Sequence, residues 1–238
     1  MNPKLVLGGE LEVRRLGFGA MRIVKDREEG VRVVRRAVEL GVTLIDTADV
    51  YGAGVSEEVV AEALHPYPDG LTIATKGGLG YGLQDRIRDG RPEHLREACE
   101  ASLRRLRLER IDLYYLHRHD PEVPVEESVG ALEQLRQEGK IRLIGVSNFS
   151  LAQLRQAQSV AKIAAVQNEY NRGLLTSEDV LGACEAEGIA FVPWSPLGES
   201  LREPAHELRW LLDRSPVMVP IPGTSKVAHL EANMQAVA

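Results

Sequence analysis

Residues 43–52 read TLIDTADVYG, a short apolar run that stops abruptly at an acid. Leu44 and Ile45 have the character of a buried strand, Asp46 ends it, and Tyr51 lies in the turn that follows. A carboxylate at the end of a buried strand is costly unless it has a partner. The stretch therefore predicts a site in which an acid and a phenol face one cavity, with partners supplied by other parts of the chain.

Composition narrows the class of protein. The chain has 238 residues, of which 44% are hydrophobic and 27% charged, and its net charge is −6 with both signs mixed along the sequence. No basic stripe for nucleic acid, polybasic membrane anchor, signal peptide or apolar run of about 18 residues is present. Cys99 and Cys184 lie in separate expected helices, so we interpret them as core residues in a reducing compartment and expect a cytoplasmic protein.

Short apolar runs alternate with helical patterns along the rest of the chain. Buried, non-alternating strands between helices are typical of parallel sheets, and eight such units predict closure into a (β/α)8 TIM barrel formed by a single domain, residues 1–238. Residues 4–13 predict a β-hairpin across Gly8-Gly9-Glu10, and residues 77–90 a mobile, glycine-rich loop. Expected strands are 15–19, 43–46, 71–75, 112–116, 141–146, 164–167, 189–194 and 217–221; expected helices are 28–40, 56–64, 92–106, 125–138, 150–158, 176–187 (capped by Thr176), 203–214 and 226 onward.

The alternative is a doubly wound dinucleotide-binding sheet. That fold favours G-x-G-x-x-G after its first strand, and residues 17–22 read GFGAMR without the third glycine. The barrel is therefore the preferred fold.

Three consecutive expected strands end in chemically useful residues. Asp46 ends the second, Lys76 the third and His117 the fourth, with Tyr51 beside them. In a (β/α)8 barrel the carboxyl ends of the strands form the active-site rim. Each residue alone has an ordinary structural explanation, such as a turn cap or a core histidine. A charged residue at the end of a buried strand, however, needs a partner, and Asp46 and Lys76 lie on neighbouring strands and can pair.

This constellation suggests proton delivery to an oxygen. A phenol has a pKa near 10, and a Lys cation about 4 Å away contributes roughly 4 kcal/mol at an effective dielectric of about 20, or roughly three pKa units. Asp46 would keep Lys76 charged, while His117 orients a carbonyl oxygen. A metal site at His117 and His119 is disfavoured because the strand ends offer no third ligand and Lys76 repels a cation.

Several motifs in order resemble the aldo-keto reductase family: RRLGFGAMR, TLIDTADVYG, IATKGG, DLYYLHRHDP, GKIRLIGVSNFS, VQNEYN, FVPWSPLG and VPIPGTSKVAHLEAN. The resemblance covers nearly the whole chain, and the hairpin resembles the family's plug at the barrel bottom. It implies a catalytic tetrad of Asp46, Tyr51, Lys76 and His117, with Tyr51 as general acid and hydride from a nicotinamide cofactor.

The same resemblance implies where the cofactor lies. Ser147, Asn148 and Gln167 would bind its carboxamide, Trp194 would stack on the nicotinamide ring, and residues 195–198 would form the pyrophosphate loop. From the residues alone, Ser147 or Ser150 is equally a helix cap and Trp194 equally a core residue. The implied cofactor-binding residues are Gly19, Met21, Ser147, Asn148, Gln167, Trp194, Ser195, Pro196, Leu197, Gly198, Gly223, Thr224, Ser225, Lys226, His229 and Asn233.

Three departures from the family pattern qualify these expectations. The adenosine-phosphate motif reads Gly223-Thr224-Ser225-Lys226 with a later His229, without the usual basic pair, so NADP(H) is expected and NAD(H) is the alternative. The segment from Leu197 to Trp210 is compressed, which predicts a shortened seventh unit. The chain ends at Ala238, which predicts a truncated C-terminus and an open substrate pocket.

The sequence therefore predicts an NADP(H)-dependent reductase of small aldehydes or ketones, active without a metal, a nucleic acid or a membrane. Its oligomeric state and natural substrate are not encoded in any motif. One alternative is a cofactor-binding sensor on the same fold, which has no need of Tyr51 and Lys76. Another is an isomerase or aldolase with Lys76 as Schiff-base nucleophile, which pairing with Asp46 disfavours because it keeps the amine protonated.

Overall fold

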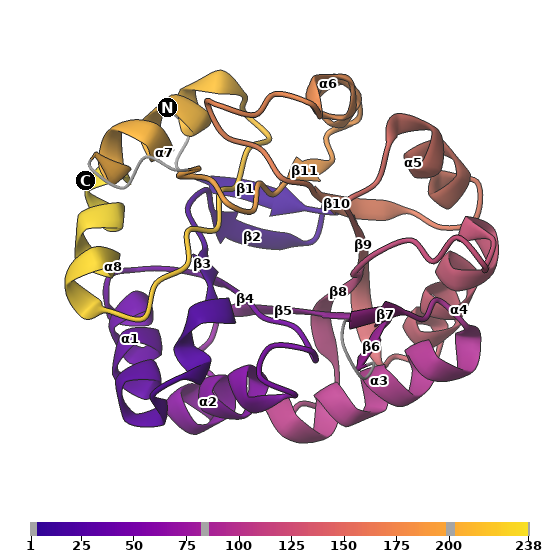
Figure 1. The fold of residues 1–238 in the computed structure, drawn as a ribbon, viewed down its shortest axis with the longest axis horizontal. Helices are drawn as coiled ribbons and strands as arrows, with labels where there is room; N and C mark the ends of the chain where they lie inside the picture. Colours follow the sequence, from indigo (N-terminus) through magenta and orange to yellow (C-terminus); the bar gives the residue numbers. More distant parts are fainter. Residues whose placement is uncertain (1–3, 82–85, 199–202, 238) are drawn as a thin grey trace.

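The computed structural model describes residues 4–81, 86–198 and 203–237. Within these residues, parallel strands pair in the order β11-β10-β9-β8-β5-β4-β3, and the chain forms a ring with helices α1 to α8 around its outside (Figure 1). The strands of the ring are β3 (Phe18–Gly19), β4 (Leu44–Asp46), β5 (Thr72–Gly77), β8 (Ile111–Leu116), β9 (Ile141–Ser147), β10 (Ile163–Gln167) and β11 (Ala190–Phe191). The helices are α1 (Arg27–Glu39), α2 (Val55–Leu64), α3 (Pro92–Leu106), α4 (Val125–Gln137), α5 (Leu151–Gln158), α6 (Glu178–Glu187), α7 (Pro204–Arg214) and α8 (Val227–Met234).

Closure of the ring depends on residues 217–223, a segment that includes the expected eighth strand, residues 217–221. The segment bonds to β11 through Phe191 N–H to Val217 O (2.9 Å) and to β3 through Gly17 N–H to Pro220 O (3.0 Å). It lacks regular strand pairing because Pro220 and Pro222 carry no N–H to donate. The predicted (β/α)8 barrel is confirmed, with its last strand reduced to isolated bridges.

A hairpin of β1 (Lys4–Leu7) and β2 (Leu11–Arg14) covers one end of the barrel, as predicted. Leu7 and Val13 are fully buried in the same cluster as the inward-facing strand residues. The turn between the strands fits closely, because Gly8 has φ +58° and a Cβ there would lie 2.8 Å from Leu143. The hairpin therefore closes the barrel end at which the strands begin.

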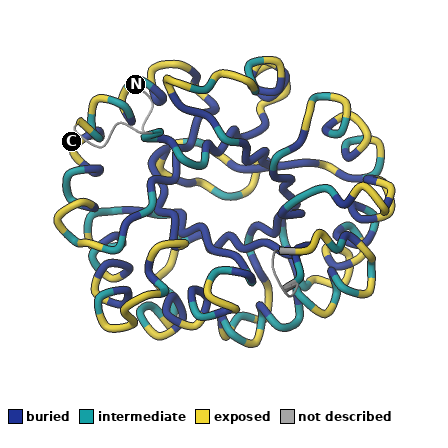
Figure 2. Tube along the Cα trace, in the orientation of Figure 1, coloured by how far each residue is buried: buried dark blue, intermediate teal, exposed yellow. Residues whose placement is uncertain are grey.

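Burial divides the molecule into layers. The strands of the ring are largely buried, whereas the helices expose their outer faces (Figure 2). The larger apolar cluster lies between strands and helices, and a smaller one fills the barrel interior above the hairpin. Among the described residues, no helix is long and apolar enough to span a membrane.

Three local expectations are corrected. Residues 77–90 were expected to be a loop but contain a second hairpin, β6 (Leu79–Tyr81) and β7 (Arg86–Arg88). Thr176 does not cap α6, whose N-cap residue is Ser177. A 3-10 helix at Ala20–Val24, unmarked by apolar periodicity, follows β3, and another, Gln235–Val237, follows α8. The compressed segment after Leu197 includes residues 199–202, which lie outside the described residues.

Candidate active site

Strand alternation decides which side chains point into the barrel. In β4, Leu44 belongs to the interior cluster and Ile45 to the cluster beneath the helices, so Asp46 faces inward again. In β5, Ala74 is likewise interior, which places Lys76 on the inner face. The same alternation in β8, β9 and β10 places His117, Ser147 and Gln167 on the inner face of the barrel.

A buried ion pair forms the floor of the site. The Lys76 Nζ lies 2.5 Å from Asp46 Oδ1 and donates to the backbone oxygen of Thr47 at 2.8 Å, and Lys76 is fully buried. Burial alone would lower the pKa of Lys76, but Asp46 and Tyr51 outweigh it and the pKa is raised. The amine is therefore a permanent cation at neutral pH, which argues against a Schiff-base nucleophile.

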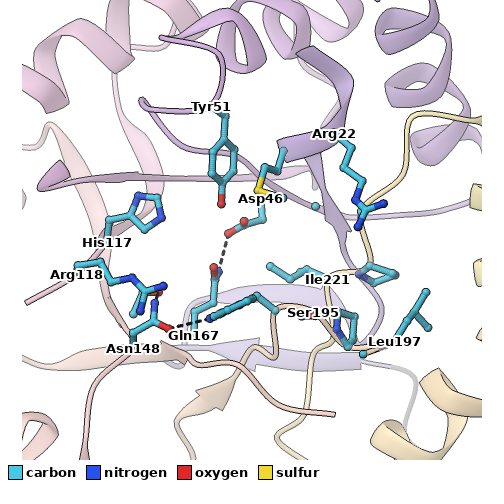
Figure 3. A pocket seen from close by; sticks show the side chains of 18 residues that line it. Arg22, Asp46, Tyr51, His117, Arg118, Asn148, Gln167, Ser195, Leu197 and Ile221 are labelled. Atoms are coloured by element: carbon cyan, nitrogen blue, oxygen red, sulfur yellow. Dashed lines mark hydrogen bonds between the residues drawn. The ribbon is translucent and has the colours of Figure 1, made fainter. Parts of the chain in front are cut away.

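Tyr51 and His117 stand above this pair. The Lys76 Nζ lies 5.2 Å from the centroid of the Tyr51 ring, and the rings of Tyr51 and His117 meet edge to face with centroids 5.9 Å apart. Figure 3 shows both side chains converging on one space with Asp46 below them. The structure thus brings all four predicted catalytic residues together.

Gln167 reaches across the barrel to the same carboxylate. Its Nε2 donates to Asp46 Oδ2 at 2.8 Å, so each carboxylate oxygen of Asp46 has a donor. Sequence reasoning assigned Gln167 only to the cofactor carboxamide and missed this contact. No spacing in the sequence encodes it, because the two residues are 121 positions apart.

An open cavity of about 350 Å³ lies above these residues at the carboxyl ends of the strands. Three of the four predicted catalytic residues line it, while Lys76 lies beneath. Eleven of the predicted cofactor-binding residues also line it: Gly19, Met21, Ser147, Asn148, Gln167, Trp194, Ser195, Pro196, Leu197, Gly198 and Gly223.

Asn148 and Ser195 lie on the side of the cavity away from Tyr51 (Figure 3), and Trp194 lines the cavity with them. Its indole Nε1–H donates to Asn148 Oδ1 at 3.0 Å, and Asn148 Nδ2 in turn donates to Ser147 Oγ at 2.7 Å. Asn148 and Ser195 both adopt the left-handed conformation, with φ +59° and +52°. Such values are uncommon for residues other than glycine and often occur at ligand-binding positions.

Five predicted cofactor residues, all C-terminal to Gly223, do not line this cavity. Thr224 is buried, and its Oγ1 accepts from Lys226 N–H at 3.1 Å, while Lys226 itself and His229 are exposed. Gly223 marks the edge of the cavity because a Cβ there would lie 2.9 Å from Gly19 O, and only glycine allows that approach. The members outside the cavity are Thr224, Ser225, Lys226, His229 and Asn233.

Four lining residues were not among the predicted site residues: Arg22, Arg118, Ile221 and Pro222. The guanidinium carbon of Arg118 lies 5.8 Å from the Trp194 ring centroid. Arg118 directly follows His117, and Arg22 directly follows Met21. Adjacency to a predicted site residue is the signal in the sequence that could have identified both arginines.

A second group of acidic residues flanks Tyr51 in the chain: Asp49 is half-buried and Glu57 is fully buried. Burial, with a contribution from the Glu57 carboxylate, raises the pKa of Asp49 to about 7, and Asp49 Oδ1 has no hydrogen-bond partner among the described residues. Glu57 is fully buried but well paired, because Arg105 Nε and Thr75 Oγ1 each donate to it at 2.6 Å. The contacts of Glu57 anchor the first turn of α2, which begins at Val55.

Metal ligation finds no support in the parts of the chain that the structure describes. No group of three or more His, Cys, Asp and Glu residues there could hold a metal ion. The metal-free site remains a prediction.

Comparisons with known proteins agree with this geometry. The model of the aldo/keto reductase family matches residues 15–207. Pyridoxine 4-dehydrogenase of Escherichia coli is 38% identical over 259 residues, covering 96% of this chain and 91% of that protein. Glycerol dehydrogenase of Gluconobacter oxydans superposes with a TM-score of 0.93 at 29% identity, covering 100% of this chain and 91% of the other. An aldo/keto reductase of Klebsiella pneumoniae, solved with NADP and acetate, gives 0.86 at 27% identity, covering 100% and 90%. The chain therefore belongs to the aldo/keto reductase family of oxidoreductases.

Proposed function

We propose that this chain uses NADP(H) to reduce aldehyde or ketone carbonyls to alcohols, with Tyr51 as the general acid. The observation that carries the proposal is the buried Lys76 ammonium, paired with Asp46 and 5.2 Å from the Tyr51 ring at the floor of an open cavity. A fully buried cation beside a phenol favours loss of the phenolic proton.

Each of the four residues then has one task. Tyr51 gives its proton to the carbonyl oxygen of the substrate, and Lys76 stabilises the negative charge left on the phenol. Asp46 holds Lys76 protonated and in place, while His117 orients the carbonyl oxygen from the other side. At a separation of about 5 Å and an effective dielectric of about 20, the attraction from Lys76 is worth about 3 kcal/mol.

The cavity also suits a nicotinamide dinucleotide, which supplies the hydride when bound. The indole of Trp194 offers an aromatic face for the nicotinamide, and Ser147, Asn148 and Gln167 offer amide and hydroxyl groups for its carboxamide. The turn closed by Gly198 N–H to Ser195 O lies at the same rim for the pyrophosphate. NADP in the similar Klebsiella protein supports this choice. Thr224, Ser225, Lys226 and the N-terminus of α8 are proposed for the 2′-phosphate, and His229 for the adenine.

Cofactor choice can be tested by tryptophan fluorescence. Trp194 lines the cavity, whereas Trp210 stacks on Tyr170 with ring centroids 6.4 Å apart. In a Trp210→Phe variant, NADPH should quench the emission of Trp194, and NADH should do so only at higher concentration. Tighter binding of NADH would overturn the choice of cofactor.

Catalysis can be tested with a panel of aldehydes and ketones, followed as NADPH oxidation. Pyridoxal belongs in the panel because of the similarity to pyridoxine 4-dehydrogenase. Tyr51→Phe should abolish reduction and leave NADPH affinity near normal, whereas retained turnover would refute Tyr51 as the acid. If NADPH binds but no carbonyl is reduced, the chain is a sensor rather than an enzyme.

A cytoplasmic location remains part of the proposal. Cys99 and Cys184 are free and buried, which is consistent with a reducing compartment. Imaging of the tagged full-length chain in its own cell is the test, and secretion would contradict it.

A further inference from the structure

Two arginines lie on different sides of the cavity (Figure 3). Arg118 lies on the side of His117 and Asn148, and Arg22 lies on the side of Ile221 and Leu197. The first is therefore close to the residues that handle the carbonyl, and the second close to the rim proposed for the pyrophosphate.

The charge of the cavity is opposite to that of the chain. The chain has a net charge of −6, yet both arginines line the cavity and Asp46 is the sole carboxylate among the described residues that line it. The Lys76 ammonium balances the charge of Asp46, and Gln167 donates a hydrogen bond to its second oxygen. A cavity with this balance attracts anions.

Arg22 and Arg118 lie near the proposed positions of two different ligands, the dinucleotide and the carbonyl substrate. The side containing Arg22 suits the phosphates of the dinucleotide. Arg118 follows His117 directly in the chain, and its guanidinium carbon lies 5.8 Å from the centroid of the Trp194 ring, which is proposed above for the nicotinamide. The nicotinamide end of the dinucleotide carries no anionic group. An anion bound by Arg118 therefore belongs to the substrate, whose carbonyl is proposed to lie between Tyr51 and His117.

We propose that the substrate is an aldehyde or ketone that carries an anionic group, a carboxylate or a phosphate, bound by Arg118. The inference rests on the reductase function proposed above and names its substrate class. A guanidinium presents five donors in a planar fork that matches carboxylate and phosphate oxygens, so it can bind a substrate anion alongside other partners. The anionic group contributes to binding and does not react. The carbonyl gains its hydride from NADPH and its proton from Tyr51, as proposed above.

The test compares the anionic and neutral members of two matched pairs. The first pair is 4-carboxybenzaldehyde and 4-formylbenzamide, and the second is pyridoxal 5′-phosphate and pyridoxal. For each pair we measure the ratio of kcat/KM, anionic over neutral, in the wild type and in Arg118→Met and Arg118→Lys. We expect a ratio well above one for at least one pair, and a loss of about 10- to 100-fold in Arg118→Met, as for a charge-assisted hydrogen bond.

Arg118→Lys should retain part of the preference, because it keeps the charge and loses the fork. The control is Arg209→Met, an exposed position on α7 that changes the net charge equally and should leave the ratio unchanged. The ratio within one variant does not depend on the fraction of folded protein, so partial misfolding does not mimic the effect.

The outcomes separate the two proposals. If no carbonyl of any kind is reduced, the reductase function itself fails. If neutral and anionic members are reduced equally well, or if Arg118→Met leaves the ratio unchanged, the anion inference alone is refuted. The pair that responds identifies carboxylate or phosphate as the bound group.

Discussion

Replacing Lys76 by Met should raise the pKa of Tyr51 by about 2 units. The Nζ of Lys76 lies 5.2 Å from the Tyr51 ring centroid, and a unit charge at about that distance contributes about 3 kcal/mol at an effective dielectric of about 20. Reduction at neutral pH should slow by about 10- to 100-fold, since proton transfer follows the acidity of the donor.

The phenolate absorbance of Tyr51 gives a direct measurement. Spectra recorded against pH in Lys76→Met, minus those of the same variant carrying Tyr51→Phe, isolate this one tyrosine from the others. The same subtraction in the wild-type background gives the reference. An unchanged titration of Tyr51 would refute the electrostatic argument, whatever the rate does.

The substitution also breaks a buried ion pair, which typically costs about 3–5 kcal/mol of stability because the remaining charge is unpaired. A double variant, Lys76→Met with Asp46→Asn, removes both charges and should recover much of that stability. If the tyrosine pKa is raised in both variants, the effect belongs to the lost cation and not to local unfolding.

Asp49→Asn should increase stability above pH 7. Burial raises the pKa of the Asp49 carboxyl to about 7, so the native state keeps a proton that the unfolded chain releases near pH 4. The free energy of unfolding of the wild type therefore falls as pH rises from about 4 to 7, by at most about 4 kcal/mol. Urea unfolding at pH 5 and pH 8 measures the slope, and equal slopes in both proteins would contradict this account. Gln167→Met removes a hydrogen-bond donor from Asp46 and should slow single-turnover reduction at saturating NADPH by about 10-fold. An unchanged rate would show that the bond to Asp46 does not affect the reaction and that Gln167 acts only in cofactor binding. Burial raises the pKa of Cys99 and of Cys184 to about 12, so neither thiol should react with iodoacetamide in native protein at about pH 8, and rapid labelling without denaturant would show that the core opens.

Several corrections have a common physical origin. Pro220 and Pro222 interrupt the pairing of the last strand, which apolar character alone did not reveal. The hairpin of β6 and β7 pairs short segments whose glycines indicated only a loop. The helices and most ring strands followed from the patterns, whereas pairing within residues 77–90 and at the last strand depended on which backbone donors and neighbours were available.

The sequence by itself determined the order of strands and helices and the residues at the strand ends. Apolar runs fix burial, and a period of two fixes which side chains face inward once one member of a strand is placed. Asp46, Lys76 and His117 could be grouped on neighbouring strands for this reason, with Tyr51 in the loop beside them. The stretch TLIDTADVYG thus predicted an acid and a phenol facing one cavity, and the two following strand ends completed the hypothesis of proton delivery.

The tertiary structure alone decided what meets across the barrel. Gln167 reaches Asp46, and Arg118 lies near Trp194, only because the sheet closes and brings distant strands face to face. Those distances depend on strand tilt and register around the whole ring, which no local pattern encodes. The residues proposed to deliver the proton could be grouped from the sequence. The position of Arg118, proposed to bind the substrate, could be found only in the folded chain.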